Sequence, residues 1–430
     1  MKIIIIHYRY YEAGGPERYL FNVMKMLSEK GHEVIPFSLD YPENKESKYS
    51  NFFPKPIIEN FHINENEDRI SFTDKLKIIK DSFFNKKVFN HLQSLIDDVN
   101  PDIAYVLQYG TKLSTSIFDV LSKNQIPIAL RLSDYNLICA KNIFYRDGNI
   151  CTECISNKFN SVIHKCVQNS LSKSIAYYAI QMFNDLRHFE RKINAFIVPS
   201  LFTYDLLISV KQFKNSKVYH IPTFSNKLPA ESSLKATVYN SKFGLKLCYV
   251  GRVAEDKGVD LLVDAVKLLL NKNINVSLDI YGDYNSDYAK IQKQKVESLK
   301  TNSIFFKGYI KSNNINKIYR KYHFCVIPSR CYDNMPNSLI ESCANGIPVI
   351  TSRIGSLDKL ISDGFNGFKF ESDNISSLAS VIESLYSIDQ NKYKTLSNNA
   401  LNWVTEHCDI DNHYDKLISI FNKLIYEKNN

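Results

Sequence analysis

Short apolar runs alternate with longer helical patterns along this chain, and this alternation constrains the fold more than any other feature. The first cycle begins with the run Lys2–His7, passes through a turn with two glycines and enters a helical pattern at Arg18–Lys30. Further short runs follow at 32–37, 103–107, 126–132 and 195–198. Buried strands that alternate with crossover helices are typical of a parallel sheet. The first half is therefore predicted to be an α/β domain.

The second half repeats the pattern. Strands are predicted at 245–250, 276–281, 304–307, 324–328 and 348–351, and helices at 259–271, 338–345, 375–387 and 412–427. Between the halves the periodicity is interrupted by Pro222, Asn226, Pro229 and Ser232–Ser233. Proline and short polar residues between two periodic segments predict an interdomain linker, which we place at 219–239.

The length of the chain also predicts two domains, because 430 residues exceed the size at which one hydrophobic core keeps growing. We predict an N-terminal Rossmann-like domain over 1–225, with the C-terminal helix of about 412–430 packing back on it. A C-terminal Rossmann-like domain is predicted over 240–405. The expected fold is α/β, with two facing parallel sheets, and ligands should bind at the carboxyl ends of the strands in the cleft between them.

Charge and cysteine content narrow the possible ligands and the cellular compartment. The formal net charge of +9 is modest for this length and suits phosphate-bearing ligands, an anionic membrane or nucleic acid. The apolar run Ile3–Ile6 is too short for a signal peptide, and no window approaches the roughly 18 apolar residues of a membrane span. Nine cysteines without a secretory signal are typical of a reducing compartment. We therefore expect a cytoplasmic protein.

A turn with two glycines links the first strand to the first helix. Gly14 and Gly15 lie in the run GGPER. Such glycines let backbone N–H groups approach an anion at the helix N-terminus, where the dipole favours phosphate. An ordinary tight turn would use the same residues, and the third glycine of the dinucleotide fingerprint is missing. The turn is therefore a candidate site only together with other motifs.

A second candidate site follows the strand at 245–250. Gly251 ends that strand, and Arg252 and Lys257 lie five residues apart in the loop before the next helix. Arginine offers a fork of donors and lysine a point charge, so this loop can hold a diphosphate. The alternative is a solvated basic loop. The position of both cations at the carboxyl end of a strand favours the binding site.

A third candidate site contains two acids, Asp333 and Glu341, which are separated by seven residues. A polar turn lies between them and enters a helix at Ser338. We expect Glu341 on the first turn of that helix and Asp333 in the loop before it. Carboxylates accept paired hydrogen bonds, which suits a ligand with vicinal hydroxyls. The alternative is a helix cap followed by a solvent-facing acid.

In this order the three motifs resemble those of the retaining glycosyltransferases of the GT-B type, the family 4 or group 1 enzymes. The resemblance runs through GGPERYLFNVMKMLSEKGHEV, CYVGRVAEDKGVDLLVDAV and PSRCYDNMPNSLIESCANGIPVI, and so spans nearly the whole chain. It implies transfer of a sugar from a UDP- or GDP-linked donor. The implied acceptor is a glycan or a lipid-linked saccharide in bacterial surface polysaccharide synthesis.

The resemblance also implies roles for individual residues. Arg252 and Lys257 would neutralise the leaving diphosphate. Glu341 would bind the ribose hydroxyls, and Asp333 would bind hydroxyls of the donor sugar. Further donor contacts would come from Gly14, Gly15, Gly251, Gly308, Tyr309, Ile310, Met335, Pro336, Asn337 and Ser338. Front-face displacement with retention would need no metal, because the diphosphate can take the acceptor's proton while cations and amides stabilise the developing charge.

Two positions depart from the family's pattern. The first acid of the pair is usually Glu, and Asp333 is one methylene shorter. The family often has a His-Asp pair after the middle strand of the first domain, where this chain has Ser133 and Asp134. Ser133 can donate a hydrogen bond but cannot carry the charge of an imidazolium. Ser133 and Asp134 are therefore only weak acceptor-side candidates.

Four of the nine cysteines fall in one segment: Cys139, Cys151, Cys154 and Cys166. Their spacing is C-x11-C-x2-C-x11-C, and the central C-x2-C is typical of tetrahedral zinc sites. These residues are candidate ligands of a structural zinc ion, which would order an acceptor-side loop without taking part in transfer. Reduced thiols and a disulfide pair are the alternatives.

A helical stretch is predicted over 72–99, and its part 75–99 combines five lysines with three phenylalanines. Such a face suits peripheral contact with an anionic membrane, and residues 174–189 invite the same interpretation. The alternative is a helix with one core face and one solvated face. Nucleic-acid binding is not expected, because no further stripe of basic and aromatic residues follows.

Two other function classes stay open. A nucleotide-sugar epimerase would need further acids and a histidine beside the acidic pair, and the sequence places none there. A sugar-nucleotide-binding scaffold without activity would be expected to lack Arg252, Lys257 or Glu341, and all three are present. Glycosyl transfer without a catalytic cofactor is therefore the leading hypothesis. Donor sugar, base, acceptor, linkage and oligomeric state are not assigned by the sequence.

Overall fold

The computed structural model describes residues 1–56, 71–225, 239, 244–310 and 314–429. Most of the predicted linker, including Asn226, Pro229 and Ser232–Ser233, and the first residues of the predicted second domain lie outside this range. The chain divides into two compact units. Unit 1 comprises Met1–Asn142, Thr152–Ile221 and His413–Asn430, and unit 2 comprises Ile143–Cys151 and Pro222–Asn412.

Unit 1 is built on a six-stranded sheet whose strands all run parallel, in the order β2-β1-β3-β4-β7-β8. The strands are β1 (Lys2–His7), β2 (Glu33–Phe37), β3 (Ile103–Gln108), β4 (Ile128–Arg131), β7 (Ala195–Val198) and β8 (Val218–His220). The first five confirm the predicted strands to within two residues at each end, and β8 was not predicted. The strand order reverses between β1 and β3, which is where α/β sheets of this kind bind ligands.

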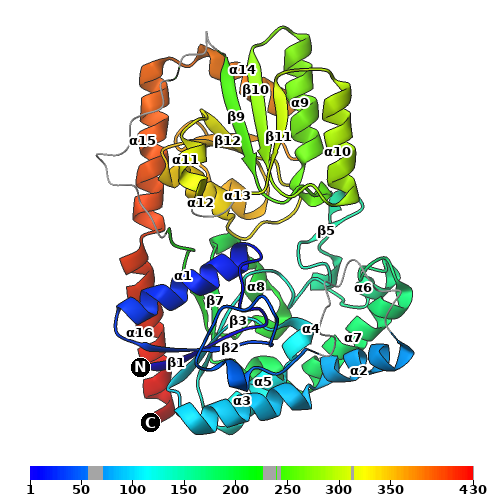
Figure 1. Cartoon of the computed structure of the whole chain (residues 1–430), viewed down its shortest axis with the longest axis vertical. Helices are drawn as coiled ribbons and strands as arrows, with labels where there is room; N and C mark the ends of the chain where they lie inside the picture. Colours follow the sequence, from blue (N-terminus) through cyan, green and yellow to red (C-terminus); the bar gives the residue numbers. More distant parts are fainter. Residues whose placement is uncertain (57–70, 226–238, 240–243, 311–313, 430) are drawn as a thin grey trace. The chain divides into compact units, whose positions relative to one another are not determined.

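The helices of unit 1 connect these strands (Figure 1). They are α1 (Gly15–Glu29), α2 (Phe72–Phe83), α3 (Lys86–Val99), α4 (Gly110–Leu113), α5 (Ser116–Lys123), α6 (Asn160–Ile163), α7 (Leu171–Leu186), α8 (Leu201–Ser209) and α16 (Ile410–Asn429). Short 3-10 turns lie at Ser50–Phe52, Glu153–Ile155, Phe189–Lys192 and Lys211–Phe213.

The helical stretch predicted over 72–99 is confirmed at both ends, but it consists of two helices. The helix ends after Phe83, and Asn85 starts a new one by accepting a hydrogen bond from the Val88 N–H through its side chain, at 3.0 Å. Among the residues of the two helices whose burial is described, only those of α3 form a regular buried apolar face, which includes Leu92 and Leu95. The cap at Asn85 starts a new helix without interrupting the apolar spacing of the sequence. The break between the two helices is therefore not visible in the periodicity.

The last helix of the chain, α16, returns to unit 1. Its His413 lies 3.0 Å from the hydroxyl of Tyr19 on α1, and that hydroxyl lies 2.8 Å from the hydroxyl of Tyr105 on β3. Phe421 packs edge-on against Tyr105, with ring centroids 5.4 Å apart. All four rings are buried, so α16 completes the core beside the first strand pair.

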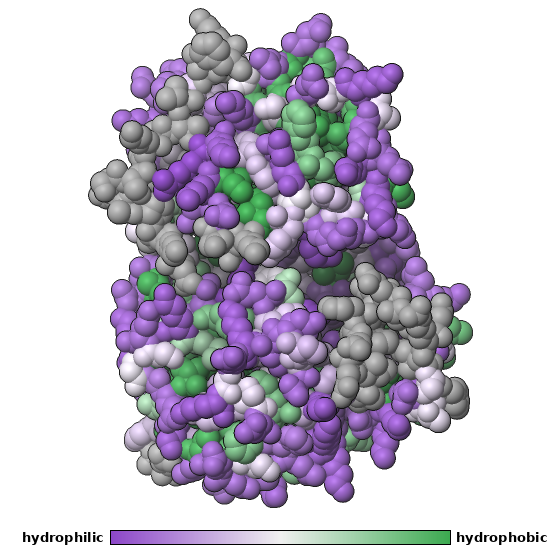
Figure 2. All heavy atoms as spheres, viewed as in Figure 1, coloured by the Kyte–Doolittle hydropathy of each residue, from purple (hydrophilic) through white to green (hydrophobic). Residues whose placement is uncertain are grey.

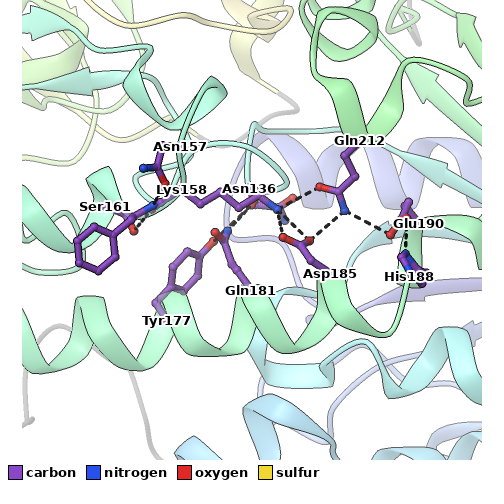
Figure 3. A network of polar contacts seen from close by, with 11 residues as sticks. Asn136, Asn157, Lys158, Ser161, Tyr177, Gln181, Asp185, His188, Glu190 and Gln212 are labelled. Atoms are coloured by element: carbon purple, nitrogen blue, oxygen red, sulfur yellow. Dashed lines mark hydrogen bonds and ion pairs between the residues drawn. The ribbon is translucent and has the colours of Figure 1, made fainter.

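The segment after β4 is held to α7 by polar contacts (Figure 3). The Tyr177 hydroxyl donates to the carbonyl oxygen of Asn136 at 3.3 Å, and the Gln181 amide donates to Tyr177 at 3.0 Å. Further along the same helix, Asp185 accepts both a 2.7 Å and a 2.9 Å bond from Lys158. Because Asn136 follows Asp134 closely in the chain, α7 fixes the backbone beside this acceptor-side candidate.

Unit 2 contains a second six-stranded parallel sheet, in the order β11-β10-β9-β12-β13-β14. Its strands are β9 (Leu245–Val250), β10 (Val276–Tyr281), β11 (Ile304–Gly308), β12 (Phe324–Ile327), β13 (Val349–Ser352) and β14 (Gly367–Phe370). This is the doubly wound order, with its reversal between β9 and β12. The sequence predicted all of these strands except β14.

Helices cover both faces of this sheet (Figure 1). They are α9 (Val259–Asn271), α10 (Asp287–Ser298), α11 (Ile315–Tyr319), α12 (Asn337–Ala344), α13 (Gly355–Leu360), α14 (Ile375–Ser384) and α15 (Gln390–His407), with 3-10 turns at Glu255–Lys257 and Leu385–Ser387. Leu247 and Tyr249 of β9 pack with α9 and α14, whereas Cys248 between them packs with α12 and α15. The alternation is that of a strand buried on both faces.

A small antiparallel hairpin, β5 (Tyr145–Arg146) with β6 (Asn149–Ile150), belongs to unit 2 although the chain around it belongs to unit 1. Among the described residues, no helix is long and apolar enough to cross a membrane. The face of the molecule shown in Figure 2 is mostly hydrophilic, with small apolar patches between.

Candidate functional site

The charged residues of the second and third motifs lie in the loops that follow β9 and β12. These strands are neighbours, and their carboxyl ends flank the point where the strand order of unit 2 reverses. Side chains from both loops therefore meet at one edge of the sheet. This is the position at which open α/β sheets bind their ligands.

Glycines shape the loop after β9. Gly258 has φ of +67°, and a Cβ on it would lie 2.0 Å from the carbonyl oxygen of Pro328. The loop after β9 therefore approaches the loop after β12 too closely for any side chain at this position. At the start of the loop, the hydroxyl of Tyr249 donates to the carbonyl oxygen of Arg252 at 2.5 Å, and a Cβ on Gly251 would lie 3.0 Å from that hydroxyl.

Lys257 is the central cation of this site. Its ammonium group donates to the Asp333 carboxylate and lies 3.5 Å from the Cys331 sulfur and 3.8 Å from Asp256. Only 18% of the Lys257 side chain is exposed. Burial opposes its charge, but Asp333, Cys331 and Asp256 outweigh burial and raise the pKa of Lys257. Lys257 is therefore a fixed positive charge at the carboxyl end of the sheet.

Arg252, the other cation of the loop, behaves differently. Its side chain is 66% exposed and pairs with Asp256 at 2.9 Å. An exposed ion pair of this kind contributes little to stability, so the guanidinium can turn to another anion at small cost. The two cations therefore provide one buried charge and one movable fork of donors.

The loop after β12 holds Asp333 in place. The Ser329 hydroxyl donates to the Asp333 carboxylate, and the Ser356 hydroxyl donates to the Asp333 carbonyl oxygen. Both serines are buried. The carboxylate is therefore anchored by Ser329 and Lys257 together, while the backbone is anchored from α13.

The helix after this loop begins at Asn337, with Pro336 as its N-cap residue and no side-chain cap. Glu341 is thus the fifth residue of α12, one residue beyond the first turn on which it was expected. The Tyr319 hydroxyl lies 3.5 Å from the Glu341 carboxylate. Met335 is buried, and its sulfur lies 3.3 Å from the backbone nitrogen of Thr223.

The three residues expected around the base lie at the end of β11. Gly308 has φ of +80°, and its carbonyl oxygen accepts a hydrogen bond from the Gly282 N–H at 3.1 Å. Tyr309 is 71% exposed, and Ile310 packs against the apolar cluster under α12. In the sheet order, β10 lies between β11 and β9, so this segment is two strands away from the strand that leads into the loop with the cations.

One ion-pair group near the site was missed by sequence reasoning. Arg330 forms two bonds to the Asp260 carboxylate, at 2.6 and 2.9 Å, and a third bond to Asp373 at 2.5 Å. The Tyr288 hydroxyl donates to the same Asp260 carboxylate at 2.6 Å. Arg330 therefore braces the loop after β12 against the start of α9. The sequence signal for this group was the position of Arg330 between the end of β12 and Asp333.

The hairpin was missed as well. The carbonyl oxygen of Ile143 accepts a hydrogen bond from the Tyr332 N–H at 3.2 Å, and Phe144 packs against the Tyr332 ring at 5.8 Å. The Tyr145 hydroxyl donates to Glu255 at 3.1 Å. The hairpin thus contacts both loops of the site, next to Asp333 and two residues before Lys257. Its sequence carries no motif that could have indicated this.

The glycine turn of unit 1 is at the start of α1. Gly15 is the first residue of the helix, and Gly14 is its N-cap residue, with an extended backbone at φ −176°. A Cβ on Gly14 would meet the Glu17 carboxylate at an ordinary 3.5 Å. Neither observation requires a glycine at position 14, so the contact between this turn and a donor stays a prediction.

The acceptor-side candidates Ser133 and Asp134 follow β4 in the same unit. The Asn136 N–H donates to the Asp134 carboxylate at 3.0 Å. Burial raises the pKa of Asp134 to about 6, and that hydrogen bond offsets only part of the effect. Asp134 can therefore change its protonation state near neutral pH.

The predicted zinc site finds no support in the described residues. No group of three or more His, Cys, Asp or Glu side chains among them is arranged to hold a metal ion. Cys151 belongs to the hairpin of unit 2, whereas Cys139, Cys154 and Cys166 belong to unit 1. The four cysteines are thus close in sequence but are carried by separate parts of the fold, and none forms a disulfide.

Part of the chain matches a known protein family. Residues 240–403 match the family model of the glycosyl transferases group 1. An uncharacterized glycosyltransferase of Methanocaldococcus jannaschii is 32% identical over 169 residues, which are 39% of this chain and 45% of the relative. The capsular polysaccharide biosynthesis glycosyltransferase CapM of Staphylococcus aureus is 25% identical over 180 residues, 42% of this chain and 46% of the relative. The chain spans less than half the length of these relatives.

Solved structures align over nearly the whole chain. Anabaena HepE, in complex with UDP and glucose, has a TM-score of 0.64 and 16% identity, and the match covers 98% of this chain and 99% of HepE. At this identity the likeness shows the fold alone. The chain has the GT-B fold, as expected from its motifs.

Proposed function

We propose that this chain transfers a sugar from a nucleotide-diphosphate donor to a carbohydrate acceptor, since residues 240–403 match the family model of the glycosyl transferases group 1. The observation that carries the proposal is the position of Lys257, a buried cation in contact with Asp333 at the strand reversal of unit 2. A buried lysine held by an acid at this edge of the sheet can neutralise a diphosphate, and the same acid can accept hydrogen bonds from sugar hydroxyls.

In this proposal the charged residues have separate roles. Lys257 and Arg252 neutralise the leaving diphosphate, the first as a fixed charge and the second by turning from Asp256. Glu341 binds the ribose hydroxyls, and Asp333 binds hydroxyls of the donor sugar. The transfer proceeds with retention and without a metal, because the diphosphate takes the proton of the acceptor.

We further propose a UDP- or GDP-linked donor and an acceptor in bacterial surface polysaccharide synthesis. The solved structure of HepE contains UDP and glucose, which supports a UDP-linked donor for a chain of the same fold. The name of CapM refers to capsular polysaccharide biosynthesis, which supports a glycan or lipid-linked saccharide as the acceptor.

A lipid-linked acceptor would bring the protein to an anionic membrane, and helices α2 and α7 support such a contact. The two helices touch each other in unit 1. Leu76 and Ile79 on α2 and Leu171 and Ile175 on α7 are large apolar residues that are exposed to solvent. The same helices carry Lys75, Lys77, Lys80 and Lys173. Apolar side chains among lysines can insert at the surface of an anionic bilayer.

The donor site is tested by thermal shift with a panel of nucleoside diphosphates and nucleotide sugars, followed by donor hydrolysis. One diphosphate should raise the unfolding temperature, because a ligand that binds only the folded state stabilises it. Glu341→Ala should abolish the shift and most of the transfer, whereas Glu406→Ala, an exposed acid on α15, should not. A flat response of the wild-type protein to every nucleotide would refute the proposal and leave the scaffold alternative.

The membrane contact has its own test. Leu76→Gln and Ile175→Gln should reduce flotation with phosphatidylglycerol vesicles, while Leu201→Gln, an equally exposed leucine on α8, serves as the control. Equal flotation of all three variants and the wild-type protein would remove α2 and α7 as the contact.

A further inference from the structure

Five side chains form a closed ring at the strand reversal of unit 1. Three of them, Tyr8, Arg9 and Tyr11, come from the loop after β1, while Tyr41 follows β2 and Lys112 lies on α4 after β3. The site proposed for the donor lies at the corresponding reversal of unit 2. The ring therefore occupies a ligand-binding position of the fold that the donor proposal does not use.

The contacts in the ring are cation–ring and ring–ring contacts. The Arg9 guanidinium lies 5.1 Å from the Tyr8 ring centre and 5.8 Å from that of Tyr11. The Lys112 ammonium lies 5.0 Å from the Tyr8 ring centre and 5.9 Å from that of Tyr41. The Tyr11 and Tyr41 rings meet edge-to-face at 5.8 Å, which closes the ring. Two cations are thus held on one aromatic frame.

The charge of Lys112 is not balanced by an ion pair. In the part of the chain that the structure describes, no carboxylate lies within ion-pair distance of Lys112. Burial, and then the charge of Arg9, lower the pKa of Lys112 to about 8. Lys112 is therefore held near a second cation in a half-buried place without a paired carboxylate, and an anionic ligand would relieve this repulsion.

Arg9 is only partly satisfied. Its guanidinium pairs with Glu17 at 3.4 Å through Nη1. Its Nε is buried and has no hydrogen-bond partner among the described residues. A buried donor without an acceptor is uncommon in folded proteins and points to a missing partner. A negatively charged acceptor atom between the two residues would accept a hydrogen bond from the Arg9 Nε and neutralise the Lys112 ammonium.

Three acids also lie near the ring. Glu17 pairs with Arg9, and the carboxylates of Glu43 and Asp134 are close enough to raise the pKa values of Tyr11 and Tyr8 respectively. These acids repel every anion, so the choice between anionic ligands rests on the number and geometry of their acceptor oxygens. A phosphate carries more charge and three acceptor oxygens, so it can bind the arginine fork and the lysine at once.

We propose that Arg9 and Lys112, framed by Tyr8, Tyr11 and Tyr41, bind a phosphate group of the acceptor. This inference rests on the proposed function and deepens it, because it names the acceptor as a phosphate-bearing saccharide. The phosphate belongs to a soluble sugar phosphate or to a lipid headgroup, and both present the same chemistry to the ring. The hydroxyls of the three tyrosines can donate to the remaining oxygens, since they stay protonated at neutral pH.

The experiment compares three matched lysine variants in their binding of inorganic phosphate, measured by titration calorimetry. Lys112→Gln should weaken binding by about tenfold or more, because one charge-assisted hydrogen bond is lost. Lys123→Gln removes the same charge from an exposed position on α5 and should bind as the wild type does. Lys257→Gln removes the cation of the donor site and should also leave this phosphate site intact.

The pattern among the variants decides the outcome. Loss of phosphate binding in Lys257→Gln but not in Lys112→Gln would place the ion at the donor site and overturn the proposal. An equal loss in Lys112→Gln and Lys123→Gln would reduce it to general attraction by surface charge, and absence of phosphate binding in the wild type would also refute it. Arg9→Gln provides a second variant in case Lys112→Gln does not fold, and it should weaken phosphate binding to a similar extent.

Two further binding measurements distinguish a soluble from a lipid-bound phosphate, and a comparison with the nucleotide panel distinguishes the phosphate site from the donor site. Glucose 1-phosphate tests a soluble acceptor, and phosphatidylcholine vesicles with and without phosphatidic acid test a lipid phosphate. Binding that depends on Lys112 in one arm assigns the source. Nucleotide binding in the thermal-shift panel reports on the donor site alone. If the wild-type protein bound phosphate at Lys112 but no nucleotide, the proposed function would be refuted and the phosphate site would stand.

Discussion

The Tyr145 hydroxyl donates a 3.1 Å hydrogen bond to the Glu255 carboxylate, although 110 positions of sequence separate the two residues. Tyr145 is buried, and burial together with the nearby Glu255 carboxylate raises the pKa of its phenol. The hydroxyl therefore remains a donor throughout the physiological range. The bond ties a hairpin from the middle of the first half of the chain to the loop that carries Lys257.

Tyr145→Phe removes this bond and keeps the ring. We expect the free energy of unfolding to fall by about 1 kcal/mol and the donor diphosphate to bind several-fold more weakly, because Glu255 loses its anchor next to Lys257. Denaturant unfolding and diphosphate titration measure the two effects. Tyr426→Phe, at an exposed tyrosine of α16, is the control. Unchanged diphosphate affinity in Tyr145→Phe would limit the hairpin to a stabilising role.

Lys257→Ala should remove most of the transfer activity and also destabilise the fold. The change leaves the Asp333 carboxylate, which is only 15% exposed, without its cation, and removal of one partner from a buried pair costs about 3 kcal/mol. Activity on the true acceptor and thermal unfolding are the measurements. Lys267→Ala, at an exposed position on α9, should change neither. Transfer at the wild-type rate in folded Lys257→Ala would exclude this lysine from the site.

Asp333→Asn separates the two partners of that contact. It keeps the size of the side chain and an acceptor oxygen for Ser329, but it loses the charge that faces Lys257. We expect selection among donor sugars to weaken more than affinity for the nucleoside diphosphate, since the carboxylate is proposed to bind sugar hydroxyls. Competition between two nucleotide sugars with the same base measures the first effect, and titration with the diphosphate measures the second. A larger loss for the diphosphate would reverse the assignment.

Most of the strands follow from sequence because each is a short apolar run between turn residues. Lys2–His7 and Leu245–Val250 are strands in the structure with the predicted ends. The strand Gly367–Phe370 escaped prediction because GFKF is short and follows a turn with no apolar run. The break between α2 and α3 escaped for a different reason: Asn85 starts the second helix through a local bond to Val88, which leaves the apolar spacing unchanged.

The candidate site could be predicted only in part. Arg252, Lys257 and Asp333 were recognisable because charged residues directly after buried strands must lie at one edge of the sheet. Their pairing was not recognisable, since Lys257 and Asp333 are 76 positions apart and only the neighbouring positions of β9 and β12 bring them together. The same holds for the hairpin at Tyr145. The zinc site stays a prediction without support among the described residues, and spacing along the chain does not show that Cys151 belongs to a different unit from the other three cysteines.

Gly258→Ala should be severely destabilising. Its new Cβ would lie 2.0 Å from the Pro328 carbonyl oxygen, and φ is +67°. We expect a loss of more than about 4 kcal/mol, because two backbone segments would have to separate. Gly31→Ala is a matched control, since its φ is +84° but nothing lies within 4 Å of its Cβ. That variant should lose about 1 kcal/mol, the conformational cost alone. Equal losses in the two variants would contradict the close approach of the loops.

Asp134→Asn should stabilise the protein at pH 8 and leave it unchanged at pH 4. Burial raises the pKa of Asp134 to about 6, above its ordinary value of 3.8, so the folded state binds a proton that the unfolded state has lost between these values. The stability of the wild-type protein therefore falls as pH rises through this window, by about 2 kcal/mol after allowance for partial exposure of the group. Asparagine carries no charge and keeps an oxygen for the Asn136 N–H. Denaturant unfolding of both proteins across the pH range measures the difference. If the two curves stay parallel from pH 4 to pH 8, the carboxyl is ionised in the folded protein throughout, and Asp134 cannot exchange a proton with an acceptor near neutral pH.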